Sequence, residues 1–424
     1  MTDLSHRKTN SRLLVTTPSG EPLSDAQVTV EQVDHAFGFG NIGFEFVDWI
    51  GGPPTGAERS NHQPTTDMES LSELWLDLFN QATLPFYWRQ FEPTPGNPET
   101  ERLQATARWF RERGIRLKGH PLLWHTLAPQ WLLELDDDGV EAAIRGRITR
   151  DVTQFAGLVD HWDAINEVVI LPDFTAEQNA VTRLAQKLGR VGMVRLAFET
   201  AREANPDVRL VLNDFELTQA YADLIRDCLD AGVEIDAIGL QTHMHQGFRG
   251  ADGIQERLEL FAQFGIPLQL TETTLVSGDL MPPHIVDLND YVVDDWPSTP
   301  EGEARQADDL VQHYTTTFTH PSVESVTYWG ITDHGAWLGA PCGLLRRDGT
   351  PKPGYDALHK LIKGEWWYGS QEHTTDSDGC LHVDSFAGRY RVTTEAGTAE
   401  VELPRGFSGD VVVDLARARP RPNW

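Results

Sequence analysis

Several features that define large classes of proteins are scarce or missing in this sequence of 424 residues. The three cysteines, Cys228, Cys342 and Cys380, are too widely spaced to form a CxxC metal pair or a disulfide framework. Apolar runs are short, and none reaches the about 18 residues that a membrane span requires. We therefore expect reduced structural thiols, no membrane segment, and no metal or other cofactor.

Basic residues are also scarce, because 35 Lys and Arg face 64 Asp and Glu, which gives a formal net charge of −29. Such a charge repels the phosphates of nucleic acid and of anionic membranes, so neither is expected as a partner. A neutral substrate fits best. The polar start of the chain, residues 1–8, lacks the apolar core of a signal peptide. This favours a cytoplasmic protein, or a secreted one if a leader has been removed.

Short apolar segments alternate with helix-like stretches through most of the chain, which is typical of a parallel α/β architecture. Eight segments have the length and composition of buried strands: 36–40, 83–86, 116–119, 161–166, 209–213, 237–241, 267–271 and 325–329. Helices are expected at 72–80, 101–113, 142–158, 182–204, 220–231, 254–264, 306–319 and 355–363. Eight strands with intervening helices predict an α/β protein with a (β/α)8 TIM barrel.

The two ends of the chain differ from this pattern, because both contain alternating apolar and polar residues of strand length. Strands are expected at 13–17 and 26–31, and again at 381–384, 388–393, 399–403 and 410–415. Neither end can bury a face alone, so we expect one small β-sandwich built from both. The predicted domains are residues 1–32 and 370–424 for the sandwich and 33–369 for the barrel. The aromatic residues of the tail are few and not adjacent, which favours a structural role for the sandwich.

Reactive side chains follow most of the predicted strands, where barrel enzymes carry their active sites. Glutamates end the fourth and seventh strands, at Glu167 and Glu272, and His, Asn, Gln or Trp follow others. Amides and carboxylates bind sugar hydroxyls, and indole faces stack on sugar rings. Thirteen Trp residues agree with sugar binding. Glycosidic cleavage needs one protonated and one ionised carboxyl group, and strands four and seven face each other across a barrel mouth.

These residues resemble glycoside hydrolase family 10, the family of endo-1,4-β-xylanases, over roughly residues 36–363. The resemblance rests on motifs in the family's order: FGFG at 37–40, FN at 79–80, KGHPLLWH at 118–125, WDAINE at 162–167, GLQTH at 239–243, LTE at 270–272, and YWGITD at 328–333 followed by Trp337. It implies a retaining hydrolase that acts by double displacement on β-1,4-xylosidic linkages in xylan or xylo-oligosaccharides.

The resemblance also implies roles for individual residues. Glu167 would be the acid/base and Glu272 the nucleophile, about 5–5.5 Å apart as in retaining enzymes. Asn166 would bind the 2-hydroxyl of the cleaved sugar, and His243 would hydrogen-bond the nucleophile with Gln241 beside it. The glycone side would be lined by His120, Trp124, Trp329 and Trp337.

One stretch departs from the family's pattern. After the second strand the family usually carries Glu-Asn-x-Met-Lys-Trp, and the sequence here, TLPFYWRQFEP at 83–93, lacks the Asn and the Lys. Arg89 is expected to stand in for the lysine, and Tyr87 and Trp88 to offer flat apolar faces to the glycone. Long loops at 42–66 and 273–303 are expected to wall the site. These changes predict a lower ratio of xylan to aryl-glycoside activity than in a standard endo-xylanase.

Three other functions compete with this interpretation. His120, His125, His243 and His245 could belong to a metal-dependent barrel hydrolase, although a His-x-His pair on the sixth strand is unusual for that class. A non-catalytic carbohydrate-binding or inhibitor protein would be expected to lose one of the two glutamates. Within glycosidases, the alternative is an exo-acting or aglycone-specific β-glycosidase that acts on small glycosides.

Overall fold

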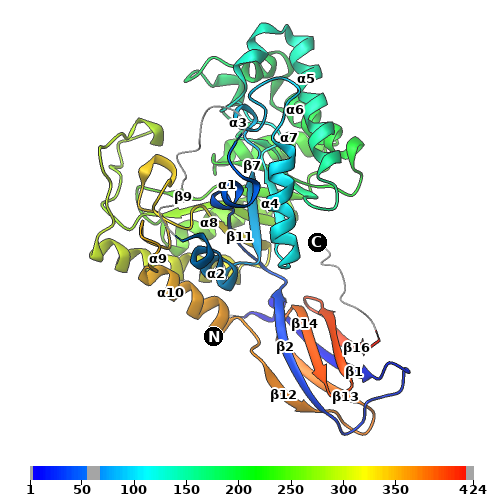
Figure 1. Ribbon diagram of the computed structural model, residues 1–424. Helices are drawn as coiled ribbons and strands as arrows, with labels where there is room; N and C mark the ends of the chain where they lie inside the picture. The colour runs from blue at the N-terminus through cyan, green and yellow to red at the C-terminus, as the bar shows by residue number, and fades with distance from the viewer. Residues whose placement is uncertain (1–2, 55–66, 417–424) are drawn as a thin grey trace. The chain divides into compact units, whose positions relative to one another are not determined.

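The computed structural model describes residues 3–54 and 67–416. The chain divides into two compact units, one formed by Phe39–Tyr355 and the other by Met1–Gly38 together with Asp356–Trp424 (Figure 1). The domain limits expected from the sequence, 1–32, 33–369 and 370–424, stay a prediction. Among the described residues, no helix combines the length and the apolar character needed to cross a membrane.

The larger unit is a closed parallel barrel. Its eight strands pair in chain order and the last pairs with the first. They are β3 (Gly38–Ile42), β4 (Gln81–Pro85), β5 (Arg116–His120), β6 (His161–Asn166), β7 (Arg209–Asp214), β8 (Ala237–Leu240), β10 (Leu268–Leu275) and β11 (Val323–Tyr328). A short strand, β9 (His243–Met244), extends β10 on one side. Nearly every strand residue is buried, as expected where a parallel sheet is covered on both faces. The predicted barrel is therefore confirmed.

Helices alternate with these strands: α1 (Glu45–Gly51), α2 (Met68–Leu78), α3 (Trp88–Phe91), α4 (Thr100–Glu112), α5 (Asp137–Gln154), α6 (Ala180–Ala204), α7 (Gln219–Asp230), α8 (Gly250–Ala262), α9 (Pro300–Thr319) and α10 (Pro353–His359). Several begin at a side-chain cap. Asp136, Asn179 and Thr299 each accept a hydrogen bond from a backbone N–H of the first turn. Such caps satisfy donors that lack partners within the helix, so these residues fix where the helices start.

The smaller unit is a sandwich of two sheets that both ends of the chain build together (Figure 1). Its strands are β1 (Lys8–Thr16), β2 (Gln27–His35), β12 (Gln371–Thr374), β13 (Cys380–Phe386), β14 (Gly388–Thr394), β15 (Gly397–Leu403) and β16 (Ser408–Asp414). β1 lies between β13 and β16 in one sheet, and β2 lies between β12 and β14 in the other. Each N-terminal strand thus has C-terminal strands on both sides, and the predicted sandwich is confirmed.

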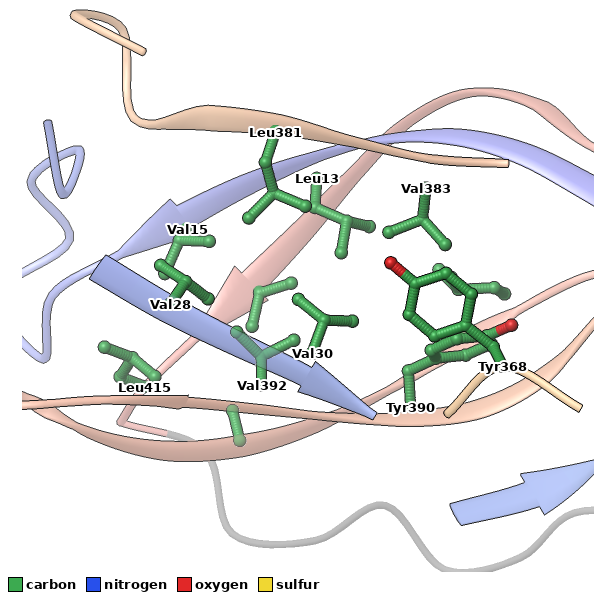
Figure 2. Packing of buried hydrophobic residues seen from close by; sticks show 13 residues of the cluster. Leu13, Val15, Val28, Val30, Tyr368, Leu381, Val383, Tyr390, Val392 and Leu415 are labelled. Atoms are coloured by element: carbon green, nitrogen blue, oxygen red, sulfur yellow. The ribbon is translucent and has the colours of Figure 1, made fainter. Parts of the chain in front are cut away.

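The core of the sandwich explains why the two sheets face each other. Alternate residues of β1 and β2, among them Leu13, Val15, Val28 and Val30, are buried against residues of the C-terminal strands (Figure 2). Tyr390 lies in the same core, and its hydroxyl donates to the carbonyl of Phe386 at 2.6 Å. Because successive side chains of a strand point to opposite faces, this alternation turns the apolar half of each strand inward.

The two long loops predicted at the barrel mouth differ in how much of them the structure describes. Within the loop at 42–66, residues 55–66 lie outside the described residues, and the described part contains α1. The loop after β10 packs with the loop after β11 around a small core, formed by Val276, Met281, Trp296, Ala340 and Cys342. The Met281 amide donates to the carbonyl of His245 at 3.0 Å, which ties this loop to the one after β8.

Candidate active site

Glu167 directly follows β6, and three side chains donate to its carboxyl group. The indole N–H of Trp124 donates to Oε2 at 2.9 Å, and the amides of Asn166 and Gln241 donate to Oε1 at 3.1 and 3.3 Å. The backbone of Glu167 is left-handed, with a φ of 58°. A non-glycine residue in this region costs about 1–3 kcal/mol. The surrounding structure therefore holds this side chain in a position that the backbone alone would not favour.

Glu272 lies within β10 rather than at its end, because this strand continues to Leu275. Its carboxylate accepts from the Asn213 amide at 2.9 Å and lies 3.1 Å from Nε2 of His243. Nε2 of His120 lies 3.9 Å from Oε1, the oxygen that also accepts from Asn213. These partners come from β5, β7 and β9, so three other strands fix the orientation of one carboxylate.

A chain of amides connects the two glutamates. Oδ1 of Asn166 accepts from Asn213 at 2.7 Å and from Gln241 at 3.1 Å. Asn166 donates to Glu167, and Asn213 donates to Glu272, while Oδ1 of Asn213 accepts from the Thr271 hydroxyl at 2.6 Å. Each amide can donate through one end and accept through the other. The network therefore sets the two carboxyl groups in fixed orientations relative to each other.

The same surroundings shift the pKa values of Glu167 and Glu272 in opposite directions. Burial, reinforced by the negative charge of Glu272, raises the pKa of Glu167 to about 8. Burial alone would also raise the pKa of Glu272, but the charge of His120 and the hydrogen bond from His243 outweigh it and leave that pKa below its ordinary value. At neutral pH the site thus holds one protonated and one ionised carboxyl group, the division of roles that acid-assisted displacement needs.

On the side away from Glu272, His120 contacts a buried ion pair between Asp163 and Lys118. Its Nδ1 lies 2.7 Å from Asp163 Oδ2, and the Lys118 ammonium lies 2.9 Å from the same oxygen. All three side chains are buried. Buried charges persist only when they are paired and hydrogen-bonded. Asp163 therefore orients the imidazole ring so that its other nitrogen faces Glu272.

Aromatic rings surround the two carboxyl groups. Trp329 lies edge-on to His120 with ring centroids 5.1 Å apart, and Trp337 lies 4.8 Å from His243. Trp337 is 38% exposed, so its face is open to a ligand. Tyr87 packs on His120 at 5.6 Å and on Trp124 at 5.7 Å. Such rings can stack on the apolar faces of sugars.

The structure brings the predicted site residues together, with two exceptions. Trp88 is buried, its indole N–H donates to Glu92 at 3.0 Å, and its ring packs on the Arg147 guanidinium at 4.7 Å. Arg89 donates to the Ala128 carbonyl at 3.0 Å and pairs with Glu177. In this segment Tyr87 is the residue that contacts His120 and Trp124.

Some residues of the site received no role from the sequence. Asn213 is the second-last residue of β7 and the last residue of the strand expected at 209–213, but nothing in the sequence indicates its contact with Glu272. Phe44 lies edge-on to Trp329 at 5.5 Å and to Tyr87 at 5.9 Å. An isolated Phe after a strand gives no signal that separates a site wall from a core residue.

The histidines at the barrel mouth are distributed among separate partners. His243 contacts Glu272 and Thr274, and burial lowers the pKa of its neighbour His245 to about 3. Burial likewise lowers the pKa of His125 to about 3, and its Nε2 lies 3.8 Å from Glu167. Within residues 3–54 and 67–416, no group of three or more His, Cys, Asp or Glu is arranged to hold a metal ion.

Gly239 on β8 is expected to be essential for the placement of Asn213. A Cβ at this position would lie 2.4 Å from Oδ1 of Asn213 and 3.0 Å from a methyl group of Val211. We expect Gly239→Ala to lower the free energy of unfolding by about 1–3 kcal/mol, as overpacked cores do, and to lower kcat by displacing Asn213 from Glu272. Urea unfolding and activity per folded molecule measure the two effects.

Gly146→Ala is the matched control, because Gly146 lies on α5 with open space around its Cβ. Alanine is favoured over glycine within a helix by about 0.5–1 kcal/mol, so this variant should be as stable as the parent or more so, with unchanged activity. Equal unfolding curves for Gly239→Ala and the parent would show that Asn213 is not packed as described.

Comparisons with known proteins point to one family. The model of glycosyl hydrolase family 10 matches residues 56–361. The anti-sigma-I factor RsgI6 of Acetivibrio thermocellus is 26% identical over 400 residues, which cover 91% of this chain and 45% of that protein. Endo-1,4-beta-xylanase C of Paenibacillus barcinonensis is 27% identical over 321 residues, which cover 68% and 29% of the two chains. This chain therefore spans less than half the length of these two relatives.

Solved structures show the same fold. A family 10 glycoside hydrolase from Paenibacillus barcinonensis superposes with a TM-score of 0.61 at 24% identity, covering 78% of this chain and 96% of that one. Native xylanase 10B from Thermotoga maritima gives a TM-score of 0.60 at 21% identity, covering 77% and 95%. Since the family model covers most of the chain and the barrel matches, this protein belongs to glycosyl hydrolase family 10.

Proposed function

We propose that this protein hydrolyses β-1,4-xylosidic linkages in xylan or xylo-oligosaccharides with retention of configuration, with Glu167 as the acid/base and Glu272 as the nucleophile. The observation that supports this most strongly is the opposite direction of the two pKa shifts in one hydrogen-bonded network. A carbohydrate substrate follows from the family. Xylan in particular is supported by the relatives, several of which are named endo-1,4-beta-xylanases.

In the first step the Glu272 carboxylate attacks the anomeric carbon while the proton of Glu167 passes to the glycosidic oxygen. The bond from that oxygen to the anomeric carbon breaks, the aglycone leaves as an alcohol, and the sugar remains bound to Glu272 as an ester. In the second step the Glu167 carboxylate takes a proton from water, whose oxygen attacks the same carbon and releases Glu272. Two inversions give net retention.

The remaining site residues support these steps. Asn166 and Gln241 hold Glu167 and can bind the sugar hydroxyl next to the anomeric carbon, and His243 and His120 keep Glu272 ionised. Trp124, Trp329 and Trp337 offer rings to the glycone. Trp88 and Arg89, which contact α5 and the loop after β5, support the wall that carries Tyr87 rather than the sugar itself.

The stereochemistry of the first product tests this proposal. NMR spectra recorded early in the hydrolysis of xylan or of an aryl β-xylobioside should show the β-anomer before mutarotation produces the α-anomer. A first product of α configuration would exclude the double displacement. Parallel assays on xylan, xylo-oligosaccharides and aryl β-glucosides test the substrate separately, since faster hydrolysis of β-glucosides would overturn the assignment of xylan and leave the mechanism intact.

A further inference from the structure

The backbone that carries Glu167 is tied to β7 at two places. The amide of Glu167 donates to the Asn213 carbonyl at 2.8 Å. Two residues later, the amide of Val169 donates to Oδ2 of Asp214 at 3.0 Å. These two hydrogen bonds lie on either side of the left-handed residue. The conformation of Glu167 is therefore fixed from consecutive residues at the end of one neighbouring strand.

The surroundings of Asp214 suit it to hold the Val169 amide. Its side chain is fully buried, and its other oxygen, Oδ1, accepts from the Glu216 amide at 3.0 Å. The backbone carbonyl of Asp214 accepts a hydrogen bond from the backbone N–H of Gln241 at 3.0 Å. One residue thus connects the loops after β6 and β7 with the end of β8, which carries a donor to Glu167. A charged acceptor makes such hydrogen bonds stronger than a neutral one.

We propose that Asp214 is a positioning residue for the acid/base, which holds Glu167 in its left-handed conformation through the Val169 amide and keeps its carboxyl group aimed at the glycosidic oxygen. This inference rests on the proposed role of Glu167. Nothing in the motifs at 162–167 or 270–272 indicates it, because Asp214 acts through the backbone of another loop and not through contact with the sugar.

The electrostatic surroundings add a second consequence. Glu167 faces Glu272 from β10, Asp214 from β7, His125 from the loop after β5 and Tyr87 from the loop after β4. Asp214 itself faces Glu216 and Tyr221. The negative charge of Asp214 contributes to the raised pKa of Glu167, after burial and the charge of Glu272. Removing the charge of Asp214 should therefore lower the pKa of Glu167.

The test compares Asp214→Asn and Asp214→Ala on two substrates assayed with the same preparation, one with a poor and one with a good leaving group. The asparagine keeps the size of the side chain, but its NH2 must face one of the two backbone donors. Misplacement of a catalytic group by about 1 Å can cost about 10²-fold. We expect kcat/KM, which reports the formation of the covalent ester, to fall by about that factor for methyl β-xylobioside, and to change by less than about threefold for dinitrophenyl β-xylobioside. The ratio of the two rates does not depend on the fraction of folded enzyme.

The pH profile and the controls complete the experiment. In the pH–rate profile measured with methyl β-xylobioside, the fall in rate at alkaline pH, its alkaline limb, should occur at lower pH in Asp214→Asn than in the parent. Asp223→Asn, at an exposed position on α7, should leave both rates and the profile unchanged. Equal losses on both substrates with an unmoved limb, or no loss on either, would overturn the inference. Glu167→Ala serves as the reference: if it shows no dependence on the leaving group, the acid/base assignment fails and this inference fails with it.

Discussion

Glu272→Ala is expected to abolish the turnover of every glycoside, whatever its leaving group. Without the carboxylate no covalent ester can form, and the shortened side chain leaves the anomeric carbon without a nucleophile. Removing the serine nucleophile of a protease that also works through a covalent intermediate costs on the order of 10⁶-fold in kcat, and we expect a loss of that order here. The loss should be equal for xylan and for activated aryl glycosides, because a good leaving group cannot replace the attacking group.

Steady-state rates on an activated aryl β-xylobioside measure this effect, with Glu256→Ala as a control. Glu256 is exposed on α8, so its loss should change nothing. The fold should survive in Glu272→Ala, since Asn213 keeps its bonds to Asn166 and Thr271. Added azide should then restore turnover with a glycosyl azide of inverted configuration, as an external nucleophile enters the vacated space. Substantial activity without azide would show that another group is the nucleophile.

The barrel and its two glutamates could be predicted from the sequence because each rests on a local pattern. A strand buried on both faces is mostly apolar, and a polar residue directly after it lies at the barrel mouth. Glu167 and Gln241 meet that description, and His120 is the last residue of β5. The sandwich followed from alternation in β1, β2, β13 and β14. β12 did not, because its four residues, Gln371–Thr374, are polar and become a strand only by pairing with β2.

The direction of individual side chains after β4 could not be predicted. Three neighbouring residues, Tyr87, Trp88 and Arg89, all look like site walls in the sequence. The one-turn helix α3 begins between the first two and points them to different sides. Trp88 is then captured by Glu92 and Arg147, partners 4 and 59 positions further along the chain. Such tertiary contacts, like those of Asn213 and Asp214, exist only once distant strands have been assembled.

The left-handed conformation of Glu167 also depends on tertiary contacts and could not be predicted from the sequence. No local sequence signal favours it, because glutamate has no preference for a positive φ. It follows from hydrogen bonds to β7, and it places the acid where Trp124 and Gln241 can hold it. Strained residues of this type are concentrated at functional sites. The strained backbone of Glu167, directly after β6, therefore supports its proposed catalytic role independently of the motif.

Glu167→Ala is expected to have an effect that depends on the substrate and on pH. The parent should hydrolyse substrates with poor leaving groups along a bell-shaped profile, which rises as Glu272 ionises and falls at about pH 8 as Glu167 loses its proton. Removing the acid should lower the rate on xylan by about 10²–10⁴-fold. Formation of the covalent ester from a dinitrophenyl glycoside should be nearly unaffected, because that leaving group needs no proton. The alkaline limb should disappear from the variant.

Pre-steady-state kinetics separate the two steps of this variant. With a dinitrophenyl β-xylobioside, Glu167→Ala should release a rapid burst of dinitrophenol and then turn over slowly, since water must attack the ester without a base. Azide, which has no proton to lose, should accelerate that second step and yield a glycosyl azide of retained configuration. Glu177→Ala, which removes a partner of Arg89 and not a site carboxylate, should keep the parent's alkaline limb. If Glu167→Ala keeps that limb as well, the ionisation belongs to another group, and the acid must be sought among the remaining carboxyl groups of the barrel mouth, beginning with Asp214, whose pKa burial raises to about 6.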